Sequence, residues 1–395
     1  MTDMAVTSAP KVQVDKLGVL IAIVAAVAAI LPFAAFRANR IVLGENHGLF
    51  AALPSWEAPI VALFIAGAIA VALVKTPVQV RLGVAFLMLA MLFVAIGHAG
   101  TFLTPPDDRI ARVSPGGGFW LLSFAFALLA ADAIARMKLK PLMRIAILLG
   151  VAAFFAVLLA SGTLNDLSIL REYANRGETF WREAQTHVAL ALGSLAAASL
   201  VGIPLGILCH RSVRLRMPVL NVLNAVQTIP SIALFGLLIA PLAWVAANIP
   251  GASALGISGI GAAPAMVALF AYSLLPVVAN TVVGLQGVPP AADDAAKGMG
   301  MTDWQRLVGV QLPLAFPVIL TGIRIVLVQN IGLATIAALI GGGGFGVFVF
   351  QGIGQTAMDL VLLGAVPTVA LAFAAAVILD AIVEMVSAKG AGRGD

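Results

Sequence analysis

The chain has 395 residues, of which 61% are hydrophobic and only 10% are charged, and its formal net charge is +5. A soluble domain carries roughly 25% charged residues, so this composition excludes a water-soluble protein of this length. The single cysteine, Cys209, excludes an internal disulfide framework. The histidines lie far apart in the sequence without ligand spacing, so no metal site is predicted.

Several apolar runs reach the roughly 20 residues that a helix needs to cross a bilayer. Segments of alternating hydrophobicity, which are typical of membrane barrels, are absent. The basic residues are scattered in short loops, a pattern that indicates membrane topology and not a nucleic-acid interface. The sequence therefore predicts an all-α, polytopic integral membrane protein whose surroundings are the lipid bilayer, with no nucleic-acid partner.

The first predicted element is a retained transmembrane helix. Lys11 and Lys16 precede an apolar run over residues 17–36. A signal peptide has a shorter apolar core, of roughly 7–15 residues, and a small-residue cleavage site. About ten spans are predicted in all, over residues 17–36, 58–75, 82–102, 118–136, 143–161, 186–209, 218–246, 262–286, 314–340 and 360–386. The seventh and ninth are long and are interrupted by proline or glycine.

Lysine and arginine set the orientation of these spans. With the N-terminus inside, fifteen basic residues fall inside, seven fall outside and Arg324 lies within a span. Both termini are therefore expected in the cytoplasm of a bacterial inner membrane protein. The inside set is Lys11, Lys16, Lys75, Arg81, Arg136, Lys138, Lys140, Arg144, Arg211, Arg214, Arg216, Lys297, Arg306, Lys389 and Arg393, and the outside set is Arg37, Arg40, Arg109, Arg112, Arg171, Arg176 and Arg182.

A change of composition near Ser161 divides the chain. Residues 1–160 form a predicted N-terminal membrane module of about five spans with little intramembrane polarity. Residues 161–185 hold seven charged residues and are too polar to cross, so they predict a periplasmic, partly helical connector. Residues 186–386 are rich in proline, glycine and polar side chains and are predicted to be the working half, followed by a cytoplasmic tail over 387–395.

Two pairs of charged residues lie within the spans. Asp132 and Arg136 are four residues apart, as are Asp380 and Glu384. An ion pair and an inner-end cluster are the favoured interpretations. A proton relay through Asp132 is the alternative, and the sequence offers no second buried acid nearby to receive the proton.

The most polar segment of the second half runs over residues 288–313, on the predicted inner surface. Ala295 and Ala296 favour a helix, and Gly298 and Gly300 end it. Residues 304–312 predict a second amphipathic helix before the next span. A short surface helix with an acidic first turn presents a carboxylate and a helix dipole to a partner. An ordinary cytoplasmic loop is the alternative interpretation.

This segment resembles the coupling-loop signature of permease subunits of ATP-binding cassette importers. That signature is Glu-Ala-Ala, three residues, Gly, nine residues, Ile, one residue and Leu-Pro. The positions that match it here are Asp294, Ala295, Ala296, Gly300, Val310, Leu312 and Pro313. Asp294 replaces Glu and Val310 replaces Ile, and the spacing is intact. The resemblance implies that these residues engage a separate ATPase.

Other segments resemble permeases for osmoprotectants such as betaine, choline and carnitine. They are Gln227 to Leu234, Tyr272 to Pro276, Asn280-Thr281, Gly298 to Met301 and Ala337 to Gly341. The resemblance covers roughly residues 186–386, and the extra N-terminal spans are similar to those of a longer subgroup that includes low-affinity glycine betaine uptake permeases. It implies a type I importer permease core with the coupling loop at 288–313.

Polar and proline residues within the predicted spans indicate either a translocation path or helix packing. Thr228, Pro230 and Ser231 lie in the seventh span, where proline interrupts the helix. A stripe of Tyr272, Pro276 and Asn280, each four residues from the next, shares one face of the eighth span. Such a stripe should face other helices or a path and not lipid, and both interpretations stay open.

The glycine-rich segment 341–346 does not predict phosphate binding. A phosphate-binding loop needs a Lys and a Ser or Thr after its last glycine, and neither follows here. The segment is assigned to a periplasmic turn or gate. Because no such motif occurs anywhere, the chain is expected to bind no ATP or other cofactor itself and to be no enzyme.

The predicted function is that of a permease subunit in an ATP-driven importer for glycine betaine or a related quaternary amine. The expected partners are a cytoplasmic ATPase, a periplasmic binding protein and a second permease chain, identical or homologous, because the ATPase works as a symmetric pair. A secondary carrier driven by an ion gradient is the alternative, although inverted repeats and buried acids are not evident. A membrane-embedded enzyme would need a catalytic cluster, and none converges in the sequence.

Overall fold

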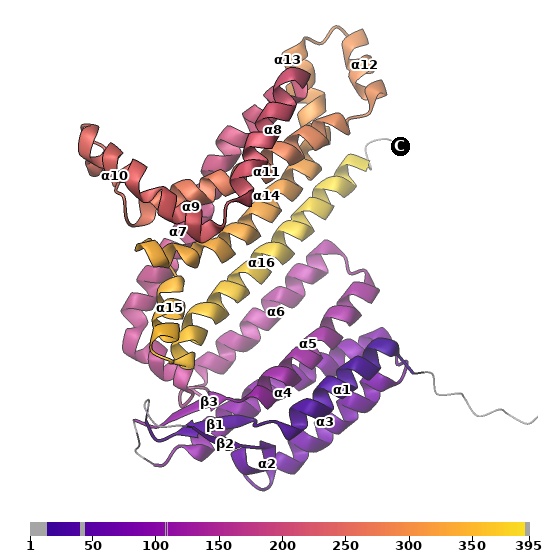
Figure 1. Ribbon diagram of the computed structural model, residues 1–395. Coiled ribbons are helices and arrows are strands. Elements are labelled where there is room, and N and C mark those ends of the chain that lie inside the picture. Colours follow the sequence, from indigo (N-terminus) through magenta and orange to yellow (C-terminus); the bar gives the residue numbers. More distant parts are fainter. Residues whose placement is uncertain (1–13, 40–43, 107, 109, 392–395) are drawn as a thin grey trace, which may run out of the picture. The chain divides into compact units, whose positions relative to one another are not determined.

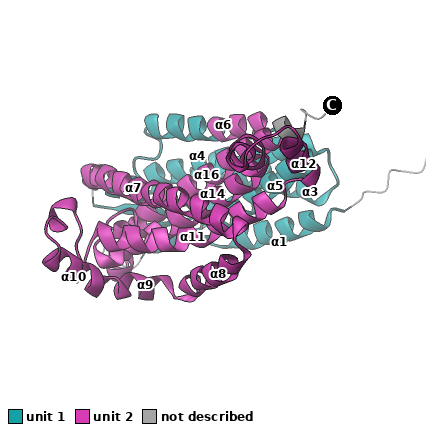
Figure 2. Cartoon of the chain, turned by 90° about the horizontal axis from the view of Figure 1, so that it is seen from above, with its two compact units in different colours: residues 1–140, 150–172 teal, residues 141–149, 173–395 magenta. Residues whose placement is uncertain are grey.

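The computed structural model describes residues 14–39, 44–106, 108 and 110–391. Among the basic residues used for orientation, Lys11, Arg40, Arg109 and Arg393 lie outside the described residues, as does the side chain of Lys389. The chain forms two compact units (Figure 2). Unit 1 holds residues 1–140 and 150–172, and unit 2 holds residues 141–149 and 173–395.

Unit 1 is a helical bundle with a small sheet at one end. Its helices are α1 (Lys16–Ile30), α2 (Leu49–Ala52), α3 (Glu57–Leu73), α4 (Val78–Leu103), α5 (Gly117–Met137) and the second half of α6 (Pro141–Ala160). Its strands are β1 (Ala34–Arg37), β2 (Glu45–His47) and β3 (Arg112–Pro115), which form an antiparallel sheet in the order β2-β1-β3.

Unit 2 contains most of α7 (Ser168–Arg211) and the elements that follow it. They are α8 (Val213–Thr228), α9 (Ser231–Leu237), α10 (Ile239–Asn248), α11 (Ala262–Gln286), α12 (Pro290–Gly298), α13 (Asp303–Arg306), α14 (Leu312–Ala334), α15 (Gly346–Gly354) and α16 (Met358–Ala391), with short 3₁₀ helices at Ser253–Leu255 and Ile336–Ile340 and a π turn at Leu307–Gln311. Helices α11, α14 and α16 pack side by side (Figure 1).

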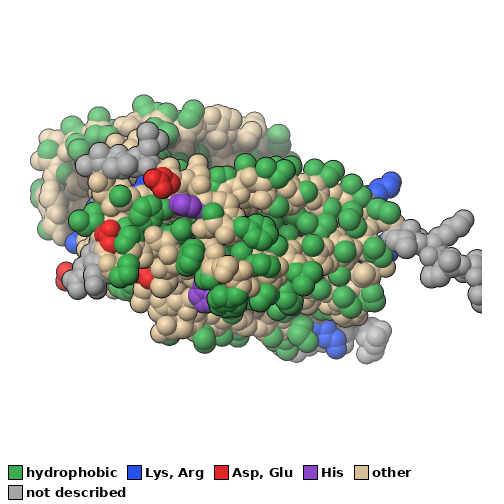
Figure 3. Space-filling view, turned by 90° about the horizontal axis from the view of Figure 1, so that it is seen from below, with side chains coloured by type: hydrophobic (Ala, Val, Ile, Leu, Met, Phe, Trp, Pro, Cys, Tyr) green, Lys and Arg blue, Asp and Glu red, His purple; other side chains and the backbone are tan. Residues whose placement is uncertain are grey.

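The predicted class is confirmed, because almost all of the described secondary structure is helical. Eight described helices are long and apolar enough to cross a membrane, and α1 and α3 are apolar but shorter, with 15 and 17 residues. Figure 3 shows a face on which hydrophobic side chains predominate and charged ones are few. The chain is therefore a multi-pass membrane protein.

Three predicted spans differ from the helices in the structure. The first, 17–36, stops as a helix at Ile30, because Leu31 is extended and Pro32 follows it, and residues 34–37 pair as β1. The seventh, 218–246, is broken between Thr228 and Ser231 into α8 and α9. The ninth, 314–340, leaves α-helical geometry at Ala334. The small sheet was not predicted, since its strands are only three or four residues long.

Four charged side chains meet at the start of α1 within unit 1. The Asp132–Arg136 ion pair is present, with Arg136 Nε 2.9 Å from Asp132 Oδ1. Arg81 lies between Asp15, at 3.0 Å, and Asp132, at 3.6 Å, and is 1% exposed. The expectation that Asp132 has no buried acid nearby is therefore wrong, because Asp15 comes from another helix end 117 residues earlier in the chain. Two cations and two carboxylates neutralise one another there.

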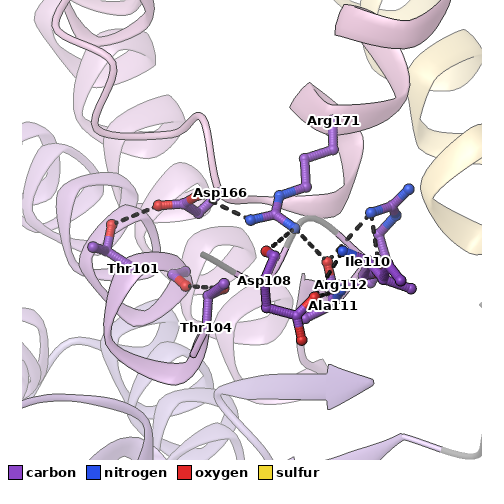
Figure 4. A network of polar contacts seen from close by, with 9 residues as sticks. Thr101, Thr104, Asp108, Ile110, Ala111, Arg112, Asp166 and Arg171 are labelled. Carbon is purple, nitrogen blue, oxygen red and sulfur yellow. Dashed lines mark hydrogen bonds and ion pairs between the residues drawn. The ribbon is translucent and has the colours of Figure 1, made fainter. Parts of the chain in front are cut away.

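A second polar network holds the first turn of α7 inside unit 1 (Figure 4). Arg171 donates to the carbonyls of Asp108 and Ala111 at 3.1 and 2.7 Å, and to Asp166 Oδ1 at 3.1 Å. The backbone N–H groups of Ala111 and Ile110 lower the pKa of Asp108. Farther along α7, Arg176 has non-helical backbone angles, and this kink lies close to the boundary between the units.

Unit 2 is held by small residues and by one buried polar triad. A Cβ atom at Gly322 of α14 would lie 2.8 Å from Asn280 Cβ, so α11 and α14 approach closely there. Asn330 Nδ2 donates to Ser194 Oγ at 2.8 Å and to Ser273 Oγ at 2.9 Å, and all three residues are fully buried. The triad joins α7, α11 and α14.

Replacing Asn330 by Leu should lower the free energy of unfolding by about 1 kcal/mol, a typical size for interhelical hydrogen bonds in membranes. Each serine would keep the bond to its own helix, to the carbonyl of Leu190 or Leu269. Denaturant titration of the purified protein in detergent checks this. Gln286→Leu, at an exposed amide on α11, is the matched control, and equal stability of the two variants would contradict the prediction.

Candidate functional site

The segment that matches the coupling signature forms a short helix, a glycine joint and a long helical run. Helix α12 ends at Gly298, and Gly300 follows with a φ of +80°, a conformation that favours glycine. Thr302 and Gln305 then form a capping box that starts α13. In Figure 1, α12 and α13 lie at the end of α14 opposite α15.

The predicted second helix, 304–312, is not a separate element. Residues 303–334 form one helical run of 32 residues through the π turn at Leu307–Gln311. Pro313 therefore lies inside a continuous run and does not open a new one. Because proline cannot donate to the carbonyl four residues earlier, a wider turn directly before it lets the helix continue.

The signature residues divide into exposed and packed positions. Asp294 and Ala295 are exposed on α12, and Gly300 is exposed in the joint. Ala296 is 1% exposed and faces inward. Val310 and Leu312 are half-buried, and Pro313 is exposed.

Two large apolar side chains of the same short segment are exposed, as Asp294 is. Met299 is 75% exposed and Trp304 is 68% exposed. We call the set Asp294, Ala295, Met299 and Trp304 the α12–α13 face. An acidic group with exposed apolar neighbours is suited to contact another protein. Sequence reasoning missed Met299 and Trp304, whose exposure depends on the fold.

Beneath this face, Asp293 connects α12 to the helical run. Its Oδ2 accepts from Arg306 Nη1 at 2.5 Å, and its Oδ1 accepts from Gln311 Nε2 at 2.8 Å. Sequence reasoning missed this residue as well, because its partners lie 13 and 18 residues later and only the folded joint brings them close.

Four of the six predicted path residues line one cavity of about 310 Å³. Gln329 and Leu333 of α14, which were not predicted, line the same cavity as the break between α8 and α9. The cavity carries no charged side chain, so its polar groups are amides, hydroxyls and backbone. Its lining consists of Gln227, Thr228, Ile229, Pro230, Ser231, Tyr272, Gln329 and Leu333.

Side chains satisfy the backbone groups that proline frees around this cavity. Pro276 has no N–H, so the carbonyl of Tyr272, four residues earlier, lacks its helical donor. Gln227 Nε2 donates to that carbonyl at 2.7 Å. The Tyr272 hydroxyl in turn donates to the carbonyl of Ile229 at the break. These two hydrogen bonds join α11 to the end of α8.

Pro276 and Asn280 are placed differently from the other four. Asn280 Nδ2 donates to the Pro276 carbonyl at 2.8 Å, and both residues pack against Gly322. Neither lines the cavity. Their position favours the packing interpretation, whereas Thr228, Pro230, Ser231 and Tyr272 surround open space.

The glycine-rich segment is a tightly held turn. Gly341, Gly343 and Gly344 all have positive φ. The N–H of Gly344 donates to buried Glu183 Oε2 at 2.8 Å, and the N–H of Phe345 donates to His187 Nδ1 at 3.3 Å. The turn presents these two N–H groups to α7.

Comparison with known proteins covers both halves of the chain. Residues 15–170 match the family described as the N-terminal domain of the ABC transporter permease YehY, and residues 202–389 match the family described as the binding-protein-dependent transport system inner membrane component. The osmoprotectant import permease protein OsmW of Salmonella typhimurium is 43% identical over 203 residues, which are 51% of this chain and 88% of the relative.

Another relative is the glycine betaine/carnitine/choline transport system permease protein OpuCB of Bacillus subtilis. It is 35% identical over 216 residues, or 55% of this chain and 92% of the relative. A chain of the inward-facing MetNI methionine ABC transporter is 22% identical and covers 53% of this chain, with a TM-score of 0.46. The sequence relatives confirm the family resemblance: the chain belongs to the osmoprotectant family of permease subunits of ATP-binding cassette importers.

Proposed function

We propose that the chain forms the translocation path of an ATP-driven importer for glycine betaine or a related quaternary amine. The observation that carries the proposal is the α12–α13 face. A coupling signature with intact spacing has its acid and first alanine exposed, on a short segment that also carries two exposed apolar side chains. A separate cytoplasmic ATPase would bind this face, and the chain itself would bind no cofactor and catalyse no reaction.

The substrate class is supported by the relatives. OsmW is named for osmoprotectants, and OpuCB for glycine betaine, carnitine and choline. A small zwitterion needs no fixed charge along its path, and the cavity at Tyr272 is lined by neutral polar groups. A periplasmic binding protein would deliver the substrate, and the cavity would hold it only in transit.

The assembly would contain two permease chains in a bacterial inner membrane. Each chain offers one α12–α13 face, whereas the ATPase works as a symmetric pair, so a second copy or a homologue is needed. Both termini and the α12–α13 face would lie in the cytoplasm, as the distribution of lysine and arginine favours. Closure of the ATPase pair would move the two faces and switch the path between inward-facing and outward-facing states.

Uptake should depend on ATP and not on an ion gradient. In cells that hold the complete transporter, uptake of radiolabelled glycine betaine should continue when ionophores collapse the proton and sodium gradients while ATP stays high. It should stop when ATP is depleted with the gradients intact. The reverse pattern would support a secondary carrier, the function that family membership disfavours.

Asp294→Arg and Gly300→Val should each weaken binding of the cognate ATPase by roughly tenfold or more. The first change reverses the charge of the α12–α13 face, and the second forces a β-branched residue into a positive φ. Binding of the purified ATPase to the permease in nanodiscs measures the effect. Glu178→Arg, which changes an exposed acid near the N-terminal end of α7, is the control. Unchanged binding by both variants would refute the proposed docking role.

Gln329→Leu should reduce uptake by roughly five- to tenfold, because it replaces a polar wall of the cavity where a desolvated solute needs a partner. Binding of the ATPase should not change. Gln355→Leu, at an exposed amide before α16, serves as control. If both leucine variants transport at the wild-type rate, the cavity is no part of the path.

A further inference from the structure

The attachment of α12 to the long helical run combines flexible joints with one charged contact. Helix α12 has only nine residues, and it is connected to α11 through residues 287–289. On its other side, residues 299–302 lead to α13, with Gly300 at positive φ. A glycine joint of this kind can bend under load. Such bending is resisted by the buried methyl group of Ala296, by the hydrogen bond from the Met301 N–H to the Ala296 carbonyl within the joint, and by the contact of Asp293 with the helical run.

Asp293 is bound at both oxygens by the run that it faces. Arg306 directly precedes the π turn and Gln311 is its last residue, and their donors are 2.5 and 2.8 Å from the two carboxylate oxygens. Two contacts at different points of one helix fix both the distance and the orientation of α12. The neighbouring Asp294 is exposed and free to meet a partner.

Arg306 also contacts Asp303, at 2.5 Å, but the surroundings of the two aspartates differ. The side chain of Asp303 is 82% exposed, whereas those of Asp293 and Arg306 are 26% and 11% exposed. Water and salt screen the exposed contact much more than the shielded one. The Asp293 contact is therefore the less screened of the two, and it is the one that joins separate elements.

The run that Asp293 holds extends to the cavity. Residues 303–334 are continuous, and near their far end Gln329 and Leu333 line the cavity while Asn330 forms the buried triad with α7 and α11. A displacement of the first turns of this run would therefore reach the cavity wall along one helix. A displacement of α12 alone would be lost in the joint.

We propose that Asp293 is a positioning residue that clamps α12 to Arg306 and Gln311, so that movement of the bound ATPase is transmitted to α14. This inference rests on the proposed docking of the ATPase to the α12–α13 face. The clamp makes no contact with substrate or ATP. It determines how much of each ATP-driven movement arrives at the cavity.

The test compares Asp293→Asn with Asp303→Asn in nanodiscs or proteoliposomes that contain the cognate ATPase and binding protein. Both changes remove one carboxylate from Arg306 and keep the side-chain shape. Three quantities are measured: binding of the ATPase, ATP hydrolysis, and uptake of radiolabelled glycine betaine per ATP hydrolysed. For Asp293→Asn, binding and hydrolysis should stay near wild type, while uptake per ATP should fall by roughly tenfold, the scale of one charge-assisted hydrogen bond. Asp303→Asn should match wild type in all three.

Two further variants test the geometry. Gln311→Met removes one of the two contacts at similar volume and should cause a smaller loss of uptake per ATP. Asp293→Glu keeps the charge and should recover most of the coupling. A purely structural role would instead reduce protein yield and thermal stability along with ATPase binding.

The possible failures can be told apart. If Asp294→Arg binds the ATPase as tightly as wild type, the proposed docking face is wrong, whatever Asp293→Asn does. If docking responds to Asp294→Arg but Asp293→Asn transports as many molecules per ATP as Asp303→Asn, the clamp is refuted. Loss of ATPase binding by Asp293→Asn would also refute it, because Asp293 would then belong to the docking face.

Discussion

Every backbone N–H and C=O group within a bilayer must find a partner inside the protein, and the interior of this chain is arranged around that requirement. The helices of unit 2 break near Pro230, lack a backbone donor at Pro276 and give way to a turn around Gly341–Gly344, and described side chains bond backbone groups at these places. Gln227 reaches the carbonyl of Tyr272, and Glu183 reaches the N–H of Gly344. The irregular places are thus connections between helices, which allows a mostly apolar bundle to contain a cavity with polar walls.

Charged side chains inside the protein also need partners. A buried cation is costly unless a carboxylate lies close to it. Arg81 lies between Asp15 and Asp132, and Arg144 contacts both Asp380 and Glu384 within unit 2. These clusters join helix ends that are remote in sequence. The proton-relay interpretation of Asp132 gains no support from them, because Asp15 and Asp132 both lie next to arginine.

The sequence was informative wherever a signal is local. The helix predicted over 262–286 coincides with α11, because a long apolar run needs no partner to be recognised. The coupling signature likewise located α12 and its glycine joint. The sheet of unit 1 could not be predicted, since each strand is too short to show a period and β1 pairs with β3 far along the chain, as between Phe36 and Val113.

Contacts between distant elements were equally hidden from sequence reasoning. Asp293 stands directly before the signature acid, and nothing local distinguishes the two carboxylates; only the fold turns one outward and the other toward Arg306. Gln329 is one of several amides in the second half, and its place on the cavity wall follows from the rotation of α14 against the break at Pro230. The fold also decides which of the predicted path residues line the cavity and which pack against α14. Tyr272, Pro276 and Asn280 share a helix face. Helix α14 approaches that face at Gly322 and covers Pro276 and Asn280, whereas Tyr272 stays beside the cavity.

A coupling device in a membrane has to satisfy two opposed demands. It must adapt to the surface of a soluble partner, which requires local freedom, and it must transmit a displacement, which requires stiffness. In this chain the two demands fall on neighbouring residues. Gly298 and Gly300 give α12 room to adjust, whereas Asp293 limits that room through two hydrogen bonds to a single helix. Because those bonds are short and largely shielded while the face above them is exposed, the stiffness lies within the permease and the recognition lies on its surface.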